Sequence, residues 1–224
     1  MMREKETQLQ HMLTRFRTKL LVMGAAVGIA LDEACAALEQ ANAGRAAAVV
    51  DGDDAVNAME NELDELALAI LVRNQPVAQD LRFVVGALRL VIDLERIGDE
   101  AASIAERTVT MGEPLPAEIM DAVLPLMHSA NALYRQAMDA FRSGDGDAAL
   151  ALCRDDDETA QQEVAALQRI MDVFCGGTRR SPGYMGMNGI LICKSLNRIC
   201  RRCANIAEHT YFIAQGVNIK HCPL

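Results

Sequence analysis

The sequence predicts an all-α protein made of two pseudo-symmetric three-helix bundles, that is, six long antiparallel helices. Hydrophobic residues make up 51% of the 224-residue chain, whereas aromatic residues make up only 4% and Trp is absent, so we expect an aliphatic core. Apolar residues recur every three or four positions through most of the chain, which is typical of amphipathic helices. The two halves also share landmark residues in register, which indicates an internal repeat.

The first half contains three apolar stripes separated by two breaks. The first stripe runs from Leu9 to Leu38 and ends at the Asn42-Ala43-Gly44 interruption. A second runs from Val49 to Leu71 and stops near Asn74-Gln75-Pro76, because proline cannot continue a helix. A third helix is expected from about residue 77 to residue 110. Long helices with short breaks of this kind pack as an antiparallel bundle.

A linker lies near the midpoint of the chain, at residues 111–116, which include one Gly and two Pro. We therefore place the first repeat at residues 1–112 and the second at residues 113–224. The helices expected in the second repeat lie at about 117–141, from the 143–146 break to about 175, and from the Gly/Pro-rich segment 176–183 to about 215.

A single offset of 102 residues aligns the two halves without a gap. It places Ile104-Ala105-Glu106 on Ile206-Ala207-Glu208, and it aligns Gly44 with Gly146. Landmarks that match at one constant spacing indicate a duplicated unit. Each position of interest in one half can therefore be compared with its counterpart in the other.

Charge and cysteine content limit the possible partners and compartments. Lys and Arg number 22 against 31 Asp and Glu, a net charge of −9, which disfavours nucleic acid as a partner. The uncharged run from Leu20 to Leu31 is too short to span a bilayer and follows a charged segment, so neither membrane insertion nor a signal peptide is expected. Seven cysteines without scaffold-like spacing indicate reduced thiols and a cytoplasmic protein.

Acidic and amide side chains form stripes on two of the predicted helices. Such side chains recur at helical spacing on one face of each helix: Asp53, Asn57, Glu60 and Asp64 on the second helix, and Glu95 and Asp99 on the third. Like charges at i, i+4 repel each other, so something should offset the cost. If the stripes face each other, they form an oxygen-rich pocket suited to Mg²⁺, Mn²⁺, Ca²⁺ or iron. Spacing alone equally allows a solvated face with Arg89 and Arg96 as ion-pair partners.

The order of motifs resembles the PhoU family of regulators of bacterial phosphate uptake. The residues that carry the resemblance span essentially the whole chain: Leu21-Val22-Met23-Gly24, residues 53–60, residues 75–82 (Gln-Pro-Val-Ala-Gln-Asp-Leu-Arg), residues 93–99 (Asp-Leu-Glu-Arg-Ile-Gly-Asp), Ile104-Ala105-Glu106, and residues 204–208. The family fold, two three-helix bundles related by pseudo-symmetry, agrees with the repeat found from the register.

The resemblance implies a metal-binding regulator. In the family, acidic motifs bind metal clusters on the bundle surface, and they correspond here to Glu95 with Asp99 and to Asp53 with Asn57, while Glu60 and Asp64 are looser assignments. The resemblance does not identify the metal, which could be iron, zinc, manganese, magnesium or calcium.

The resemblance also implies partners. Family members act with the ATPase subunit of a phosphate-specific ABC transporter and with the phosphate-sensing histidine kinase, repressing both when phosphate is plentiful. We accordingly expect a non-enzymatic, cytoplasmic homodimer that reaches the inner membrane only through its partners.

The second repeat departs from the acidic pattern. The offset aligns Thr159 with Asn57, Gln162 with Glu60, Asn197 with Glu95 and Arg201 with Asp99, so that only Asp155, aligned with Asp53, keeps its carboxylate. The guanidinium of Arg201 is positively charged and takes the place of the Asp99 carboxylate, so it opposes cation binding. We therefore expect one metal site and a degenerate second site that is held by an Arg201–Asp155 ion pair or binds an anion.

Several alternatives stay open at this stage. A carboxylate-bound cation can activate water, so a metal-dependent phosphohydrolase is the main alternative. A PhoU-domain paralogue attached to another transporter is a second alternative. Cys193, Cys200 and Cys203 share one helix and are expected to be small core residues rather than zinc ligands. An Arg-rich patch could be a solvated cationic face, or it could contact a partner, an anion or neighbouring acids; it comprises Arg179, Arg180, Arg198, Arg201 and Arg202.

Overall fold

The computed structural model describes residues 2–154, 156–176 and 183–219, and no strand occurs among them. The helices are α1 (Met2–Glu39), α2 (Ala43–Asn74), α3 (Ala78–Met111), α4 (Ala117–Ser143), α5 (Gly146–Arg154), α6 (Asp156–Gly176) and α7 (Gly183–Gln215). The single helix predicted before residue 175 corresponds to α5 and α6, which lie on either side of residue 155. The all-α prediction is confirmed.

Local capping chemistry sets several helix ends. Asn42 caps α2, since its side-chain oxygen accepts a hydrogen bond from the backbone N–H of Arg45 at 3.0 Å. The cap starts α2 at Ala43, within the Asn42-Ala43-Gly44 interruption predicted from sequence. Gly112 and Gly144 end α3 and α4 in the left-handed conformation, with φ of 65° and 71°, which glycine adopts at little cost.

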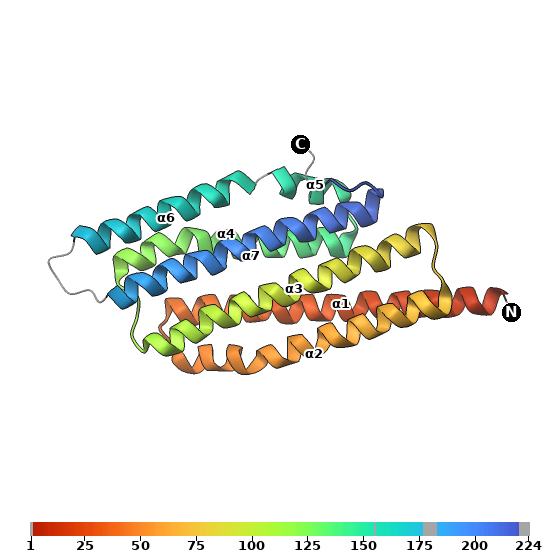
Figure 1. Ribbon diagram of the computed structural model, residues 1–224, viewed down its shortest axis with the longest axis horizontal. Coiled ribbons are helices and arrows are strands. Elements are labelled where there is room, and N and C mark those ends of the chain that lie inside the picture. Colours follow the sequence, from red (N-terminus) through yellow and green to blue (C-terminus); the bar gives the residue numbers. More distant parts are fainter. Residues whose placement is uncertain (1, 155, 177–182, 220–224) are drawn as a thin grey trace.

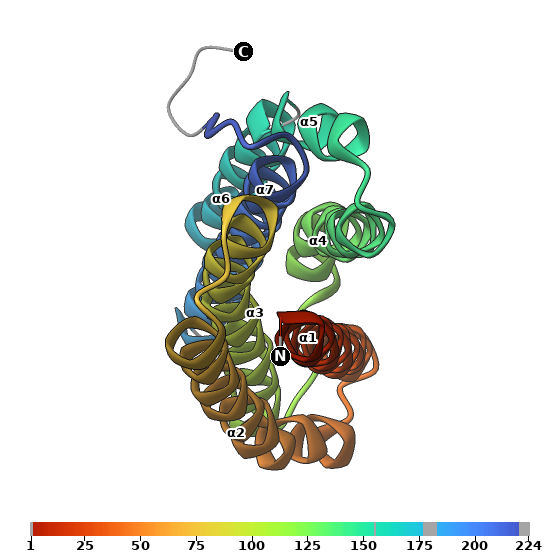
Figure 2. The same ribbon diagram turned by 90° about the vertical axis from the view of Figure 1, so that its right-hand side faces the viewer.

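The two bundles lie side by side along one long axis (Figure 1). α1, α2 and α3 pack on one another in the first bundle, and α4, α5, α6 and α7 form the second. Seen along the long axis, α3 and α7 lie next to each other on one side of the molecule and join the bundles, while α1 and α4 make a second, lighter contact on the other side (Figure 2). The acidic stripes therefore sit on the helix pair of the first bundle that includes the central α3.

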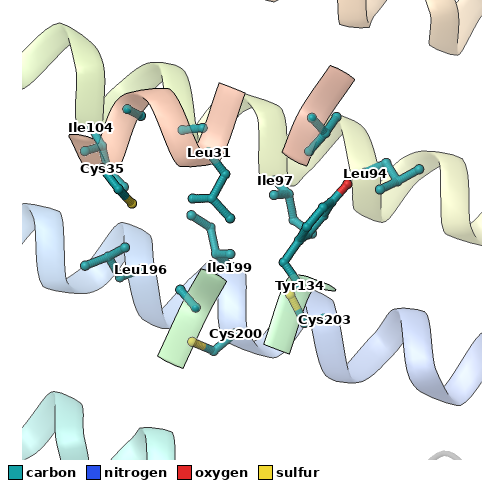
Figure 3. Close-up of a cluster of buried hydrophobic side chains, with 14 of the residues drawn as sticks. Leu31, Cys35, Leu94, Ile97, Ile104, Tyr134, Leu196, Ile199, Cys200 and Cys203 are labelled. Carbon is teal, nitrogen blue, oxygen red and sulfur yellow. The ribbon is translucent and has the colours of Figure 1, made fainter. Parts of the chain in front are cut away.

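The core is aliphatic, as expected, and it is shared between the bundles. Leu94 and Ile97 of α3 and Leu196 and Ile199 of α7 are fully buried and gather in one cluster (Figure 3). Burial of such side chains stabilises the fold by about 1.5–3 kcal/mol each. The main core cluster therefore draws on both bundles, and a smaller cluster of Ala140, Ala149 and Ala207 lies within the second.

Cysteines belong to this core. Cys193, Cys200 and Cys203 are buried and are not disulfide-bonded. Burial raises the pKa of Cys193 to about 12, and it raises that of Cys203 as well. Since the thiolate is the metal ligand, the raised pKa values of Cys193 and Cys203 agree with their role as small core side chains.

The first helix is long and apolar enough to span a membrane by length and composition alone. Its most apolar stretch within Glu6–Glu39 has a mean hydropathy of 1.8, and 44% of that stretch is buried inside the protein. A core helix has the same properties, so the expectation that the chain does not insert into a membrane stays a prediction.

Candidate functional site

The two acidic stripes face each other across α2 and α3. Burial and, next, the charge of Asp99 raise the pKa of Asp53 above its usual range. Burial and the charge of Asp64 raise the pKa of Glu60, to which Asp99 also contributes. A Cβ at Gly98, the residue before Asp99, would lie 3.6 Å from Asp53 Oδ1, so the acidic faces of α2 and α3 are adjacent.

Glu95 and Asn57 complete the set. Burial, followed by the charge of Asp99, raises the pKa of Glu95. Asn57 donates a hydrogen bond from Nδ2 to Asp53 Oδ2 over 3.4 Å. Asp64 is exposed at the edge of the group, which agrees with its looser assignment. The raised pKa values reflect burial together with mutual repulsion of crowded carboxylates.

One arginine partly neutralises this group. Arg96 lies with Nε 3.2 Å from Glu95 Oε2 and with Nη1 3.2 Å from Asp99 Oδ2. Its side chain is 55% exposed, so these pairs are weak and can open without a large cost. Arg89, the other expected partner, instead lies over the Phe212 ring at 5.6 Å. The ion-pair alternative thus holds for Arg96 but is wrong for Arg89.

The donor chemistry of this group fits a hard cation. Its side chains offer only carboxylate and amide oxygens, the ligands that such ions prefer, and a cation would offset the repulsion that raises the pKa values of Asp53, Glu60 and Glu95. In the described part of the chain, however, no three His, Cys, Asp or Glu side chains converge closely enough to enclose an ion. The metal site therefore stays a prediction, and binding would require side chains to rotate inward.

The corresponding place in the second bundle is organised differently. Glu163 of α6 is buried, and its two oxygens have separate partners on α7. Asn197 Nδ2 donates to Oε2 over 2.5 Å, and Lys194 Nζ lies 2.9 Å from Oε1. The Lys194 ammonium thus supplies a positive charge within the chain, beside Asn197, the counterpart of Glu95.

The remaining residues of the expected second site have different surroundings. Thr159 is buried, Gln162 donates to Glu158 over 3.3 Å, and Arg201 is exposed with no ion pair among the described residues. Asp155 lies outside the described residues, so the proposed Arg201–Asp155 pair is untested. Sequence comparison missed Glu163 and Lys194, because their counterparts in the first repeat, Asn61 and Ile92, carry no charge. Helical spacing could have identified them. Glu163 is one turn from Thr159, and Lys194 is one turn from Asn197, so each shares a helix face with a residue of the expected second site.

Two arginines of the Arg-rich patch contact neighbouring acids of α3. Arg198 Nε lies 3.2 Å from Glu100 Oε1, and Arg202 Nη1 lies 2.9 Å from Asp93 Oδ1. Arg179 and Arg180 lie outside the described residues. Among the interpretations of the patch, contact with neighbouring acids therefore accounts for Arg198 and Arg202.

Asp93 is the centre of a buried polar network between the bundles. Its side chain accepts from Arg202, from Asn205 Nδ2 at 3.1 Å, and contacts His209 Nε2 at 3.2 Å, all on α7. Burial alone would raise its pKa, but the hydrogen bonds from His209, Asn205 and Arg202 hold the pKa of Asp93 below its usual range. Sequence analysis found Asp93 within a motif but gave it no role.

The fold and this site together define a class: all-helical proteins of paired three-helix repeats, with an acidic face on the first repeat. The chain belongs to the PhoU family. The PhoU domain matches it twice, over residues 20–108 and 124–210. The phosphate-specific transport system accessory protein PhoU homologue of Pseudomonas aeruginosa is 33% identical over 93% of this chain and 86% of that protein. The PhoU protein of Escherichia coli is 28% identical over 93% and 86%.

Solved structures of the family share the fold. The crystal structure of PhoU from Pseudomonas aeruginosa matches with a TM-score of 0.87 and 32% identity, covering 93% of this chain and 99% of that one. The phosphate transport system regulatory protein PhoU from Streptococcus pneumoniae matches with a TM-score of 0.85, at 22% identity over 94% and 98% of the two chains. The family resemblance inferred from the motifs is confirmed.

Proposed function

We propose that this protein is a cytoplasmic, non-enzymatic regulator that represses phosphate uptake and phosphate-starvation signalling when phosphate is plentiful. One observation carries the proposal: both repeats match the PhoU domain, and the chain aligns with most of the length of relatives that are named as accessory proteins of the phosphate-specific transport system. A match that spans the whole architecture supports a shared role more strongly than a match to a single motif.

The proposed direct partners are the ATPase subunit of the phosphate ABC transporter and the phosphate-sensing histidine kinase. The accessory role in the names of the relatives supports a contact with transporter components. Long helices offer extended surfaces to such partners. We also propose a homodimer, which light scattering of the purified protein tests directly.

A deletion strain tests the regulatory role. Without the protein, a phosphate-starvation reporter is expected to stay on in high phosphate, and the wild-type chain supplied in trans should turn it off. A reporter that stays off in the deletion strain would contradict the proposal. Co-purification of a different transporter, in place of the phosphate transporter, would instead favour the paralogue alternative, for which the altered second repeat with its Lys194–Glu163 pair is the supporting observation.

A metal ion forms part of the proposal. Asp53, Asn57, Glu60, Glu95 and Asp99 would hold it, and when bound it would supply positive charge that offsets carboxylate repulsion between α2 and α3. Oxygen-only donors favour iron, manganese, magnesium or calcium over zinc, which prefers nitrogen and sulfur ligands.

Elemental analysis tests this part. We expect about one site's worth of metal per chain, as the single acidic repeat implies, and its loss in the Glu95→Gln/Asp99→Asn double variant. An Asp172→Asn variant, altered at an exposed acid of α6, should keep its metal. Equal metal content in all three proteins would show that the ligand assignment is wrong. Hydrolysis of a phosphoester panel by the wild type, lost in the double variant, would favour the phosphohydrolase alternative.

A further inference from the structure

A solvent-accessible groove lies between α1 and α2 of the first bundle and reaches α3 at Gly98; it is called the α1–α2 groove. Its volume is about 210 Å³, and small or aliphatic residues line most of it, among them Ile29, Ala48, Val49, Gly52, Ala55 and Val56. Val49 and Val56 form buried parts of its wall, and Ile29 stands at its edge. The groove thus offers an apolar surface of the kind that another helix can cover.

The α1 side of this groove is unusually apolar for a water-facing surface. Ile29 is 65% exposed, and Val22, seven residues earlier on the same helix face, is 52% exposed. Exposing apolar area costs about 25 cal/mol per Å² compared with burying it. An exposed apolar ridge beside a groove is typical of an interaction surface.

The α2 side contains a glycine that the packing of the chain itself does not require. A Cβ at Gly52 would meet no atom within 4 Å, whereas a Cβ at Gly86 or Gly189 would clash at 2.4 Å and 2.7 Å with packed side chains. Glycine in a helix interior is less favourable than alanine. The space at Gly52 is therefore available for close approach by something outside the described chain.

The charge around the groove indicates what that occupant carries. Asp53 lines the groove beside Gly52, and Asp51 and Asp54 lie next to the groove in sequence on α2. None of the three has an ion pair among the described residues. Glu33, by contrast, is neutralised by Arg45 on the groove wall. The unpaired charge beside Gly52 is negative, so a complementary surface carries Lys or Arg.

We propose that the α1–α2 groove docks an amphipathic helix of a partner protein, with an apolar ridge seated over Gly52 and basic side chains over Asp51 and Asp54. Small residues at Ala48, Gly52 and Ala55 permit the close axial approach of two helices, and the apolar ridge supplies the buried area of a helix-in-groove contact. The inference rests on the proposed function, which makes the ATPase subunit of the phosphate transporter the source of this helix.

The test measures binding of the full-length chain to the purified ATPase subunit by biolayer interferometry. Gly52→Leu and Ala55→Leu fill the groove and should weaken binding at least tenfold. Ala132→Leu, the same change at an exposed position of α4 outside the groove, should bind like the wild type. Gly52→Ala should raise the Tm, because alanine favours helix, and metal content should stay at the wild-type level in every variant.

A charge variant tests the second half of the proposal. Asp51→Asn should lower the affinity several-fold and reduce its dependence on salt, since it removes one charge from the acidic side of the groove. Unchanged affinity and salt dependence would contradict the assignment of basic side chains to the partner.

The outcomes separate the inference from the proposed function. Wild-type and groove-filled chains that bind the ATPase equally well would overturn the groove assignment and leave the regulatory role intact. No binding by the wild type would overturn both the groove assignment and the proposed transporter contact. A wild-type dimer that Ala55→Leu converts to a monomer, with ATPase binding unchanged, would assign the groove to a second copy and overturn the proposal.

Discussion

The two bundles place different polar groups between their second and third helices. In the first, Asp53, Glu60 and Glu95 crowd together with raised pKa values, and the exposed side chain of Arg96 only partly balances them. In the second, Glu163 is buried with one cationic and one amide partner, Lys194 and Asn197. One fold therefore supports two ways of balancing charge.

The difference shows in which repeat an external ion would offset unbalanced charge. A buried carboxylate is tolerated when its partners lie within the protein, as for Glu163. Crowded carboxylates without enough internal cations are favoured when something else supplies positive charge. The first repeat is accordingly the one in which a metal or a basic partner can change stability and shape, whereas the second has its cation built in.

The largest expected effect concerns Asp93, which joins the two repeats. Asp93→Asn removes a charge that Arg202, Asn205 and His209 surround, and we expect a loss of about 3 kcal/mol in the free energy of unfolding, since breaking a buried pair leaves its partners unsatisfied. Urea denaturation measures it. Asp172→Asn on the exposed face of α6 should change stability by less than about 0.5 kcal/mol.

The pH dependence of this effect has a definite sign. Because the pKa of Asp93 is lowered in the folded state, its stabilising contribution is present above the unfolded pKa of about 3.9 and is lost as the pH falls through the folded value. The stability difference between wild type and Asp93→Asn should therefore shrink below about pH 4. A difference that grows on acidification would contradict the network.

A smaller effect is expected at Lys194. Lys194→Met leaves Glu163 without its cation, but the Lys194 side chain is 49% exposed, so solvent screening limits the expected loss to about 1 kcal/mol. The double variant Lys194→Met/Glu163→Gln should recover most of it, as a double-mutant cycle reports. Additive losses would show that the ammonium does not stabilise Glu163, and the contrast between the repeats would fail.

The smallest effect is expected at Glu95 in the metal-free protein. Glu95→Gln removes one of the crowded charges. It should raise the free energy of unfolding by about 0.5 kcal/mol at neutral pH when a chelator keeps the protein free of metal. This difference between variant and wild type should shrink as the pH falls through the raised pKa of Glu95, because the protonated carboxyl no longer repels its neighbours. Glu65→Gln, at an exposed position of α2, serves as the control. An equal gain in stability in this variant would show that the effect at Glu95 does not come from repulsion among neighbouring carboxylates.

Much of the architecture follows from local sequence. Helix ends are short-range events: Asn42 caps its own helix, Pro76 cannot continue one, and Gly112 adopts a left-handed conformation at little cost. The acidic stripes were likewise predictable, since residues four apart share a helix face whatever the neighbours are. The alignment of the two halves at an offset of 102 residues also showed which positions of the second repeat lack the acidic residues of the first.

Tertiary structure alone decided which faces meet. Asp93 and His209 are 116 positions apart, and no periodic pattern says which helix an acid will face. Glu163 meets Lys194 only because α6 packs on α7, and Gly52 becomes notable only once the space beside it proves open. The sequence by itself thus determined the helices, their breaks and the charge on each face, because these depend on neighbours within one or two turns. The pairing of α3 with α7, the internal cation and the groove depended on long-range packing, which local sequence does not encode separately.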